Sequence, residues 1–68
     1  MNNNKADIGQ RIKSIRTKKG MTLEEFGALF SAGKGLVSRW ERGISTPNPE
    51  RIKAISKVGD TSVEYILH

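Results

Sequence analysis

Residues 22–43 decide the fold of this chain, and they read TLEEFGALFSAGKGLVSRWERG. The segment opens on a capping-box pattern, in which Thr22 is followed three residues later by Glu25. This pattern marks a helix start and predicts a helix over 22–30. A short turn follows, and a second helix over 34–42 ends before a glycine. The stretch therefore predicts two short helices joined by a tight turn.

The helix over 34–42 carries two faces of different chemistry when its residues are spaced at about 100° each. One face holds Leu36, Val37, Trp40 and, at its edge, Glu41. The opposite face holds small, hydroxyl and cationic residues without an acid: Lys34, Gly35, Ser38, Arg39 and Arg42. Such a face can lie against DNA, because small residues permit close approach and cations neutralise phosphate or read guanine. An ordinary solvated face is the alternative, although solvated faces usually mix both signs of charge.

Three more helices are predicted from apolar residues at helical spacing, over 7–19, 49–58 and 62–67. The expected core residues outside the helix over 34–42 are Ile8, Ile12, Ile15, Phe26, Phe30, Ile52, Ile55, Val58, Val63, Ile66 and Leu67. Strand-like alternation is absent from the sequence, and glycines and prolines separate the helices. We therefore expect an all-α protein, a compact five-helix bundle over 6–68 that follows a flexible tail over 1–5.

Two charged residues lie at the edges of apolar stripes. Arg16 follows Ile12 by four residues, and Glu41 follows Val37 by four residues. A charge in such a position is rarely tolerated without a partner. We therefore expect a partly buried ion pair between Arg16 and Glu41 that links the first and third helices.

Gly27 lies inside a predicted helix, where glycine costs about 1 kcal/mol relative to alanine. A close crossing by the helix over 34–42 would explain it. A glycine that is merely tolerated is the alternative.

The charge balance favours a polyanionic partner. Twelve lysines and arginines against seven acids give a net charge of +5. This excess suits nucleic acid or an anionic membrane surface, although a basic surface can also simply keep a protein in solution. No apolar run approaches the roughly 20 residues that span a bilayer, and the polar residues 1–5 do not resemble a signal peptide. We expect a cytoplasmic protein that does not bind membranes.

The residue types argue against an enzyme. The chain has no cysteine, and its one histidine is the terminal His68, so neither a metal site nor a catalytic base is indicated. Ser38 has no base placed beside it, and no glycine-rich phosphate loop follows a strand. We expect no catalytic residues, no cofactor and no small-molecule ligand. RNA binding is disfavoured, because Phe26, Phe30 and Trp40 are assigned to the core and leave no stacking platform.

Taken together, these motifs resemble the Cro/C1-type helix-turn-helix family of phage and bacterial repressors. The resemblance rests on TLEEFG at 22–27, VSRWERG at 37–43, the loop residue Pro47 and SVEYIL at 62–67, and it covers about residues 8–67. It implies a lambda-repressor-like bundle that binds double-stranded DNA and places the helix over 34–42 in the major groove. The family's structural Arg–Glu pair falls on Arg16 and Glu41.

The resemblance also implies which residues contact DNA. The positions that match base-reading residues are Lys34, Gly35, Ser38 and Arg39. The positions that match phosphate contacts are Thr22, Leu23, Arg42, Ser45 and Thr46, and we expect Lys18 to add salt-sensitive affinity. Arg39 is the best candidate for a bidentate contact to guanine.

Three departures from the family pattern bear on these contacts. Leu23 replaces a usual glutamine, which leaves only its backbone N–H for phosphate and makes its side chain available to the core. Gly33 replaces a serine or threonine, so both a helix cap and a hydroxyl contact are lost. Gly35 replaces a residue that commonly reads a base, and its lack of a side chain lets the backbone come close to DNA.

The expected function is transcriptional repression by occupancy of promoter DNA. The resemblance implies a homodimer on a near-palindromic operator, with half-sites about one helical turn, roughly 34 Å, apart. We expect weak self-association through the fifth helix, which exposes Tyr65. The alternative is a protein-interaction module, similar to an antirepressor, that keeps the fold without binding DNA. An apolar or acidic outer face on the helix over 34–42 would favour that alternative.

Overall fold

The computed structural model describes residues 4–68, and that part of the chain contains five α-helices and no strand. The helices are α1 (Lys5–Lys18), α2 (Leu23–Ala28), α3 (Lys34–Glu41), α4 (Pro49–Val58) and α5 (Val63–Leu67). This confirms the predicted all-α bundle. Within residues 4–68, no helix has both the length and the apolar character needed to cross a membrane.

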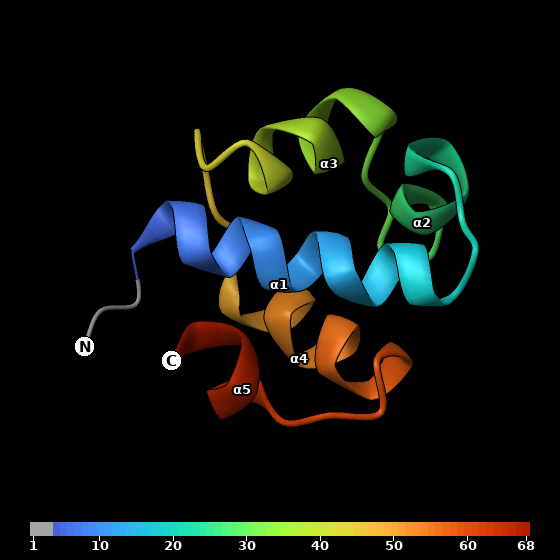
Figure 1. Ribbon diagram of the computed structural model, residues 1–68. Coiled ribbons are helices and arrows are strands. Elements are labelled where there is room, and N and C mark those ends of the chain that lie inside the picture. Colours follow the sequence, from blue (N-terminus) through green and yellow to red (C-terminus); the bar gives the residue numbers. More distant parts are fainter. Residues whose placement is uncertain (1–3) are drawn as a thin grey trace.

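Helix α1 runs through the middle of the molecule (Figure 1). Helices α2 and α3 lie on one side of it, and α4 and α5 lie on the other. Helix α3 packs on both α1 and α2. On the other side of α1, α4 and α5 pack on each other, and α5 also packs on α1. The inner side of α3 therefore contacts α1 and α2, and its outer side faces away from the rest of the protein.

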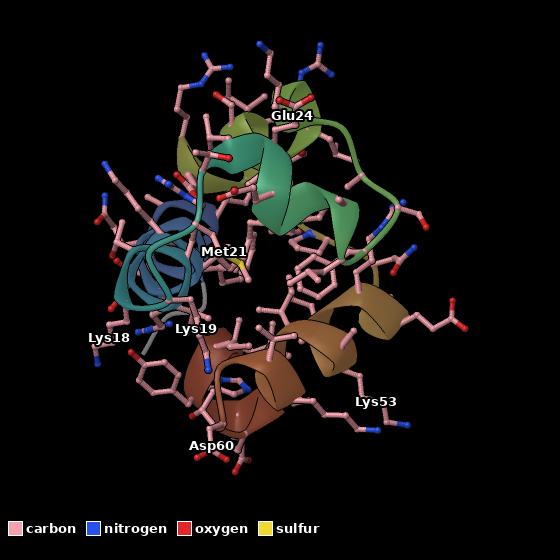
Figure 2. The ribbon with its side chains drawn as sticks, turned by 90° about the vertical axis from the view of Figure 1, so that its right-hand side faces the viewer. Lys18, Lys19, Met21, Glu24, Lys53 and Asp60 are labelled. Atoms are coloured by element: carbon pink, nitrogen blue, oxygen red, sulfur yellow. The ribbon has the colours of Figure 1, made fainter. Side chains whose placement is uncertain are left out.

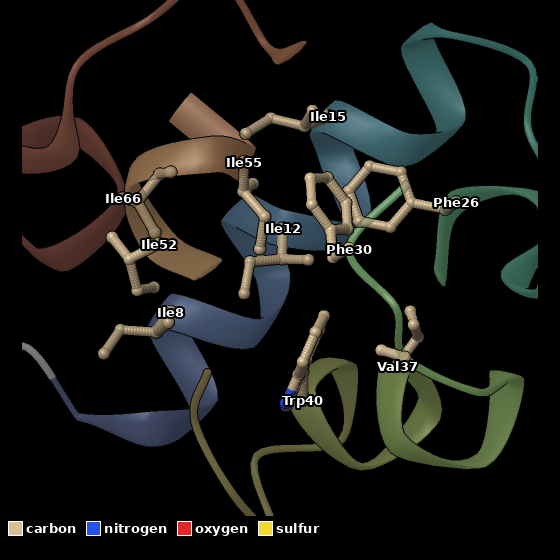
Figure 3. Packing of buried hydrophobic residues seen from close by; sticks show 11 residues of the cluster. Ile8, Ile12, Ile15, Phe26, Phe30, Val37, Trp40, Ile52, Ile55 and Ile66 are labelled. Atoms are coloured by element: carbon tan, nitrogen blue, oxygen red, sulfur yellow. The ribbon is translucent and has the colours of Figure 1, made fainter. Parts of the chain in front are cut away.

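A single apolar core fills the space between the helices (Figure 3). The buried apolar residues are Ile8, Ile12, Ile15, Phe26, Phe30, Ala32, Val37, Trp40, Ile52, Ile55 and Ile66. The rings of Phe26 and Phe30 meet edge to face with centroids 4.9 Å apart, the favoured geometry of an aromatic pair. Most of the expected core is thus confirmed, with Val58 and Leu67 only half-buried at its margin.

Val63 is an exception, because its side chain is 36% exposed and lies outside the core. It is the first residue of a helix of only five residues, in which apolar spacing cannot distinguish an inner from an outer face. The prediction that Val63 is buried was wrong.

The start of α1 also differs from the prediction. The helix begins at Lys5 rather than near Asp7, because the side chain of Asn4 accepts a hydrogen bond of 2.8 Å from the Asp7 backbone N–H. The predicted tail over 1–5 is therefore wrong at Asn4 and Lys5, and its first three residues lie outside the described residues.

Helix α2 is shorter at both ends than the predicted 22–30. Thr22 is its N-cap, and the N–H groups of Leu29 and Phe30 bond to carbonyls three residues earlier, at 3.1 and 2.9 Å. Such bonds belong to a tightened last turn rather than to the α-helix itself.

Two glycines let the elements around α3 come into close contact. At Gly27, an added Cβ would overlap the carbonyl oxygen of Ala32 in the turn and lie 3.0 Å from a methyl group of Val37. The predicted cause is therefore only partly right, because the turn approaches more closely than α3 does. At Gly9, which sequence reasoning did not single out, an added Cβ would overlap the carbonyl of Trp40 and lie 2.8 Å from that of Glu41.

Candidate nucleic-acid interface

Helix α3 is anchored through its inner face. Val37 is fully buried and Trp40 is 1% exposed, and both side chains point into the core (Figure 3). On the other side, Lys34, Gly35 and Arg39 are exposed, and Ser38 is half-buried. The division into two faces is the one that the sequence predicts, with Arg42 exposed at the C-cap.

Arg16 and Glu41 form the predicted ion pair between α1 and α3. The Nε and Nη2 groups of Arg16 donate to the two carboxylate oxygens of Glu41 at 2.6 and 3.1 Å, and Nη1 donates to the Met21 carbonyl at 2.9 Å. The hydrogen bond to Glu41 raises the pKa of the Arg16 guanidinium above its ordinary value, while partial burial opposes that shift. With side chains only 14% and 8% exposed, the pair fixes the C-terminal end of α3 against α1 and the connection before α2.

The outer face of α3 has one internal hydrogen bond. The Nε group of Arg42 donates to the Ser38 hydroxyl oxygen at 3.1 Å. Because this bond uses Ser38 as an acceptor, the hydroxyl proton remains available for a phosphate or a base edge. The side chains of Lys34 and Arg39 make no hydrogen bond to any other part of residues 4–68, so their cationic groups are available to an external anion.

The N-terminus of α3 is unlike the other four helix starts in residues 4–68. Asn4, Thr22, Asn48 and Ser62 each accept a backbone N–H of the helix that they begin, whereas Gly33 at the start of α3 has no side chain to do so. The first turn of α3 also carries no acid, in contrast to the first turns of the other helices. The positive end of its helix dipole therefore faces solvent without compensation.

Two backbone donors are available at this N-terminus. The N–H groups of Leu36 and Val37 bond to the Gly33 carbonyl at 3.1 and 3.2 Å, and those of Lys34 and Gly35 precede any intrahelical partner. An added Cβ at Gly33 or Gly35 would have no atom within 4 Å. The first turn of α3 thus presents uncovered backbone to whatever approaches it.

The predicted phosphate residues at the start of α2 have clear local roles. The Thr22 hydroxyl accepts from the Glu25 N–H at 3.1 Å, and the Glu25 carboxylate accepts from the Thr22 N–H at 2.9 Å, which completes the capping box. The Leu23 side chain is half-buried against the core, as its replacement of a polar residue suggests. Its backbone N–H lies in the first turn of α2 and has no intrahelical partner.

The loop after α3 contains two further predicted phosphate residues. Thr46 is exposed. The Ser45 hydroxyl oxygen is buried and has no hydrogen-bond partner in the described part of the chain. In this conformation the hydroxyl faces inward, and only a rotation of the side chain would bring it to a phosphate.

Lys18 does not lie with the other predicted contacts. It is exposed near the end of α1 and borders a hollow together with Asp60 and Tyr65. Figure 2 shows Lys18 on the side of α1 that faces Asp60, away from Glu24 and α3. The structure therefore does not bring Lys18 together with the outer face of α3.

These features define a class of protein. A short helix is fixed through its inner face on a preceding helix and a tight turn, and it presents cations, a hydroxyl and exposed backbone donors on its outer face. Helix-turn-helix domains use this arrangement to place their second helix in the major groove of DNA. The fold and the surface of α3 are those of such a domain.

The chain belongs to the helix-turn-helix family of DNA-binding transcription regulators, whose model matches residues 12–66. This family is a regulator fold and not an enzyme family. The predicted resemblance to Cro/C1-type repressors is confirmed by this match and by the relatives described next.

Three curated relatives illustrate the range of the family. The transcriptional regulator SinR of Bacillus subtilis (strain 168) is 38% identical over 61 residues, which are 88% of this chain and 55% of that protein. The repressor protein C2 of Salmonella phage P22 is 32% identical over 88% of this chain and 28% of its own length. The transcriptional activator BcrR of Enterococcus faecalis is 28% identical over 90% of this chain and 30% of its own length. The chain thus spans between about a quarter and little more than half of these relatives.

Two solved structures share the fold. The P22 c2 repressor in complex with a synthetic operator superposes with a TM-score of 0.82 at 32% identity, over 88% of this chain and 91% of that one. The biofilm regulator SinR in complex with DNA superposes with a TM-score of 0.77 at 37% identity, over 90% of this chain and 98% of that one. Both proteins were solved on DNA.

Proposed function

We propose that this domain binds a specific operator sequence through α3 and represses transcription by occupying promoter DNA. The observation that carries the proposal is the outer face of α3, which combines exposed cations and a hydroxyl with an uncompensated helix N-terminus. A partner with regularly spaced negative charges and acceptor edges fits all of these features at once. The same face is basic rather than apolar or acidic, which argues against an interaction module that does not bind DNA.

Within this interface, we assign base readout to four residues and phosphate binding to the flanks. Arg39 is exposed on the outer face one turn after Gly35 and offers a guanidinium suited to guanine. Lys34, Gly35 and Ser38 would lie beside it along the groove. Thr22, the Leu23 N–H, Arg42 and Thr46 would contact phosphates, and Ser45 would do so only after its hydroxyl turns outward.

The start of α3 supports a particular way of approaching DNA. Because Gly33 and Gly35 have open space around their Cα atoms, a phosphate or base edge can come within hydrogen-bond distance of the Lys34 and Gly35 N–H groups. The anionic acceptor would then take the place of the missing N-cap. DNA would thus cap the N-terminus of α3, whereas side chains cap the other four helices of residues 4–68.

We also propose that two copies bind one near-palindromic operator. Val63 is an exposed apolar residue of α5 that borders a shallow hollow of about 350 Å³ together with Pro49, Glu50 and Lys53 of α4. The self-association predicted through α5 would use this patch, which shares that helix with the exposed Tyr65. A regulator of this kind would act on the DNA of the cell, in the cytoplasm.

The first experiment selects duplexes from a randomised pool at two salt concentrations and sequences the bound fraction. An enriched palindrome with half-sites about ten base pairs apart is the expected result. Binding without enrichment that disappears as salt rises would show only attraction between charges, and the proposal would then fail. Sedimentation of wild-type protein and Val63→Glu, each with and without the selected operator, tests the dimer. Strictly monomeric wild-type protein in both conditions would contradict it.

A further inference from the structure

A hollow lies on the side of α1 that faces away from α3. It measures about 470 Å³ and opens between the C-terminal half of α1, the connection from α4 to α5, and α5 itself. Lys18 and Lys19 border it from α1, Asp60 and Thr61 from the connection, and Tyr65 from α5. Figure 2 shows Lys18, Lys19 and Asp60 at this end of the molecule, with α3 at the other end.

The lysine, aspartate and tyrosine side chains that border the hollow form no ion pair and no hydrogen bond within residues 4–68. Within residues 4–68, Arg16 and Glu41 make the one ion pair, so the ammonium groups of Lys18 and Lys19 are unpaired although the Asp60 carboxylate borders the same hollow. The Tyr65 side chain is 46% exposed, and its hydroxyl makes no hydrogen bond to the described residues. The hollow therefore offers two cations and an aromatic ring without internal partners.

The shape and charge of the hollow select among ligands. A concave site of several hundred Å³ encloses a few side chains of a peptide, whereas a DNA duplex is far wider than such a site. Two ammonium groups against one carboxylate favour an anionic ligand. An exposed tyrosine is a side chain enriched in protein interfaces.

We propose that this hollow is a docking site for an acidic peptide segment of a partner protein. Carboxylates of the segment pair with Lys18 and Lys19, and an apolar side chain between them packs on the ring of Tyr65. Helix α5 and the connection from α4, which border the hollow, lie on the opposite side of α1 from α3 (Figure 1). A partner therefore docks while α3 is bound to DNA, and the domain holds a second protein at its DNA site.

The experiment measures binding of a fluorescein-labelled nine-residue peptide of alternating glutamate and leucine by fluorescence anisotropy. A matched peptide carries glutamine in place of glutamate. The test variant is Lys18→Glu with Lys19→Glu. The matched control is Lys13→Glu with Lys57→Glu, which makes the same change in net charge at two exposed lysines that border neither hollow. Thermal unfolding verifies that both double variants are folded.

The wild-type protein is expected to bind the glutamate peptide and to bind the glutamine peptide far more weakly. The Lys18/Lys19 variant raises the Kd by about tenfold or more, whereas the control variant changes it by less than about threefold, because only close charge pairs couple strongly. Tyr65→Ala weakens binding as well, and the amide shifts caused by the peptide lie at α1's C-terminal half and around Asp60. Equal losses in both double variants, no binding, or shifts on the outer face of α3 would overturn the proposal.

Operator binding by the same variants distinguishes failure of the docking site from failure of the proposed DNA-binding function. Because the hollow faces away from α3, the Lys18/Lys19 variant is expected to lose no more DNA affinity than the control variant. A loss of operator affinity confined to the Lys18/Lys19 variant would mean that Lys18 or Lys19 contacts DNA. That result would overturn the docking site. Wild-type protein that binds the peptide but selects no operator would support the docking site and contradict the proposed function alone.

Discussion

The two ends of α3 are built on opposite principles. At the C-terminal end, Trp40 is buried, Glu41 is paired with Arg16, and α1 approaches so closely that residue 9 must be glycine. At the N-terminal end, Gly33 supplies no cap, and an added Cβ at Gly33 or Gly35 would touch nothing.

The two ends of this eight-residue helix therefore have different roles, one in orienting α3 and one in contacting a partner. The C-terminal end sets the orientation of α3 through contacts that are complete within the protein. The N-terminal end leaves donors, a dipole and open space that only an external partner can use. Substitutions at the first end are therefore expected to change stability, and substitutions at the second end or on the outer face are expected to change DNA binding.

The largest effect is expected from Glu41→Ala. The substitution leaves the Arg16 guanidinium without its carboxylate in a site where its side chain is only 14% exposed, and removal of one partner from a buried pair costs about 3–5 kcal/mol. Urea unfolding measures the loss. The double variant Arg16→Met with Glu41→Leu is the control and should lose less, because no charge is left unpaired. A loss below about 1 kcal/mol for Glu41→Ala would mean that the pair behaves like an exposed one.

Gly9→Ala is expected to be the next most damaging substitution. The new methyl group would overlap the carbonyls of Trp40 and Glu41, so α3 must move away from α1, and overpacking of this kind costs about 1–3 kcal/mol. Thermal or urea unfolding measures the cost. Stability at or above that of the wild type would show that the approach of α1 to α3 is looser than the structure indicates.

Arg39→Ala tests the outer face rather than the anchor. Loss of a bidentate contact to guanine should weaken binding to the selected operator by about 1–3 kcal/mol, or roughly fivefold to 150-fold. Because the Arg39 side chain is exposed and makes no hydrogen bond within residues 4–68, stability should stay within about 0.5 kcal/mol of wild type. Titration of both the operator and a random duplex decides the role: equal losses on the two would make Arg39 a phosphate contact.

Sequence reasoning predicted the anchored end of α3 well. The spacing of Val37 and Trp40 gave the inner face, and the positions of Arg16 and Glu41 at the edges of apolar stripes gave the ion pair. Both rest on helical periodicity and on the cost of an unpaired charge, and both are local properties of the sequence. The close approach at Gly9 was missed, because nothing near residue 9 indicates which backbone will cross it.

Other features depended on information that the sequence does not carry locally. The Asn4 cap lies within an asparagine-rich start that reads as a polar tail, and Val63 belongs to a helix too short for its apolar spacing to define a face. Lys18 was predicted at the DNA interface from its charge alone. Its place beside Asp60 and Tyr65 depends on how α4 and α5 pack against α1, which is a property of the tertiary structure.

The smallest effect is expected from Gly35→Ala. This variant tests most directly how the two ends of α3 differ, because it makes the Gly→Ala change at the N-terminal end of α3 that Gly9→Ala makes against the C-terminal end. Gly35→Ala adds the same methyl group as Gly9→Ala, but at Gly35 no atom lies within 4 Å of it. Alanine favours the helix over glycine, so stability should rise by about 0.5–1 kcal/mol. If DNA approaches the backbone here as proposed, operator affinity should fall although the free protein is more stable.

Urea unfolding and operator titration of the Gly9→Ala and Gly35→Ala variants make the comparison quantitative. Opposite signs in stability, with the loss of operator affinity confined to Gly35→Ala under conditions where both variants are folded, would show that the fold requires the first glycine and DNA requires the second. A Gly35→Ala variant that is stabilised and binds the operator as well as wild type would contradict close backbone approach. Readout would then rest on the side chains of Lys34, Ser38 and Arg39, with the first turn of α3 held away from the groove.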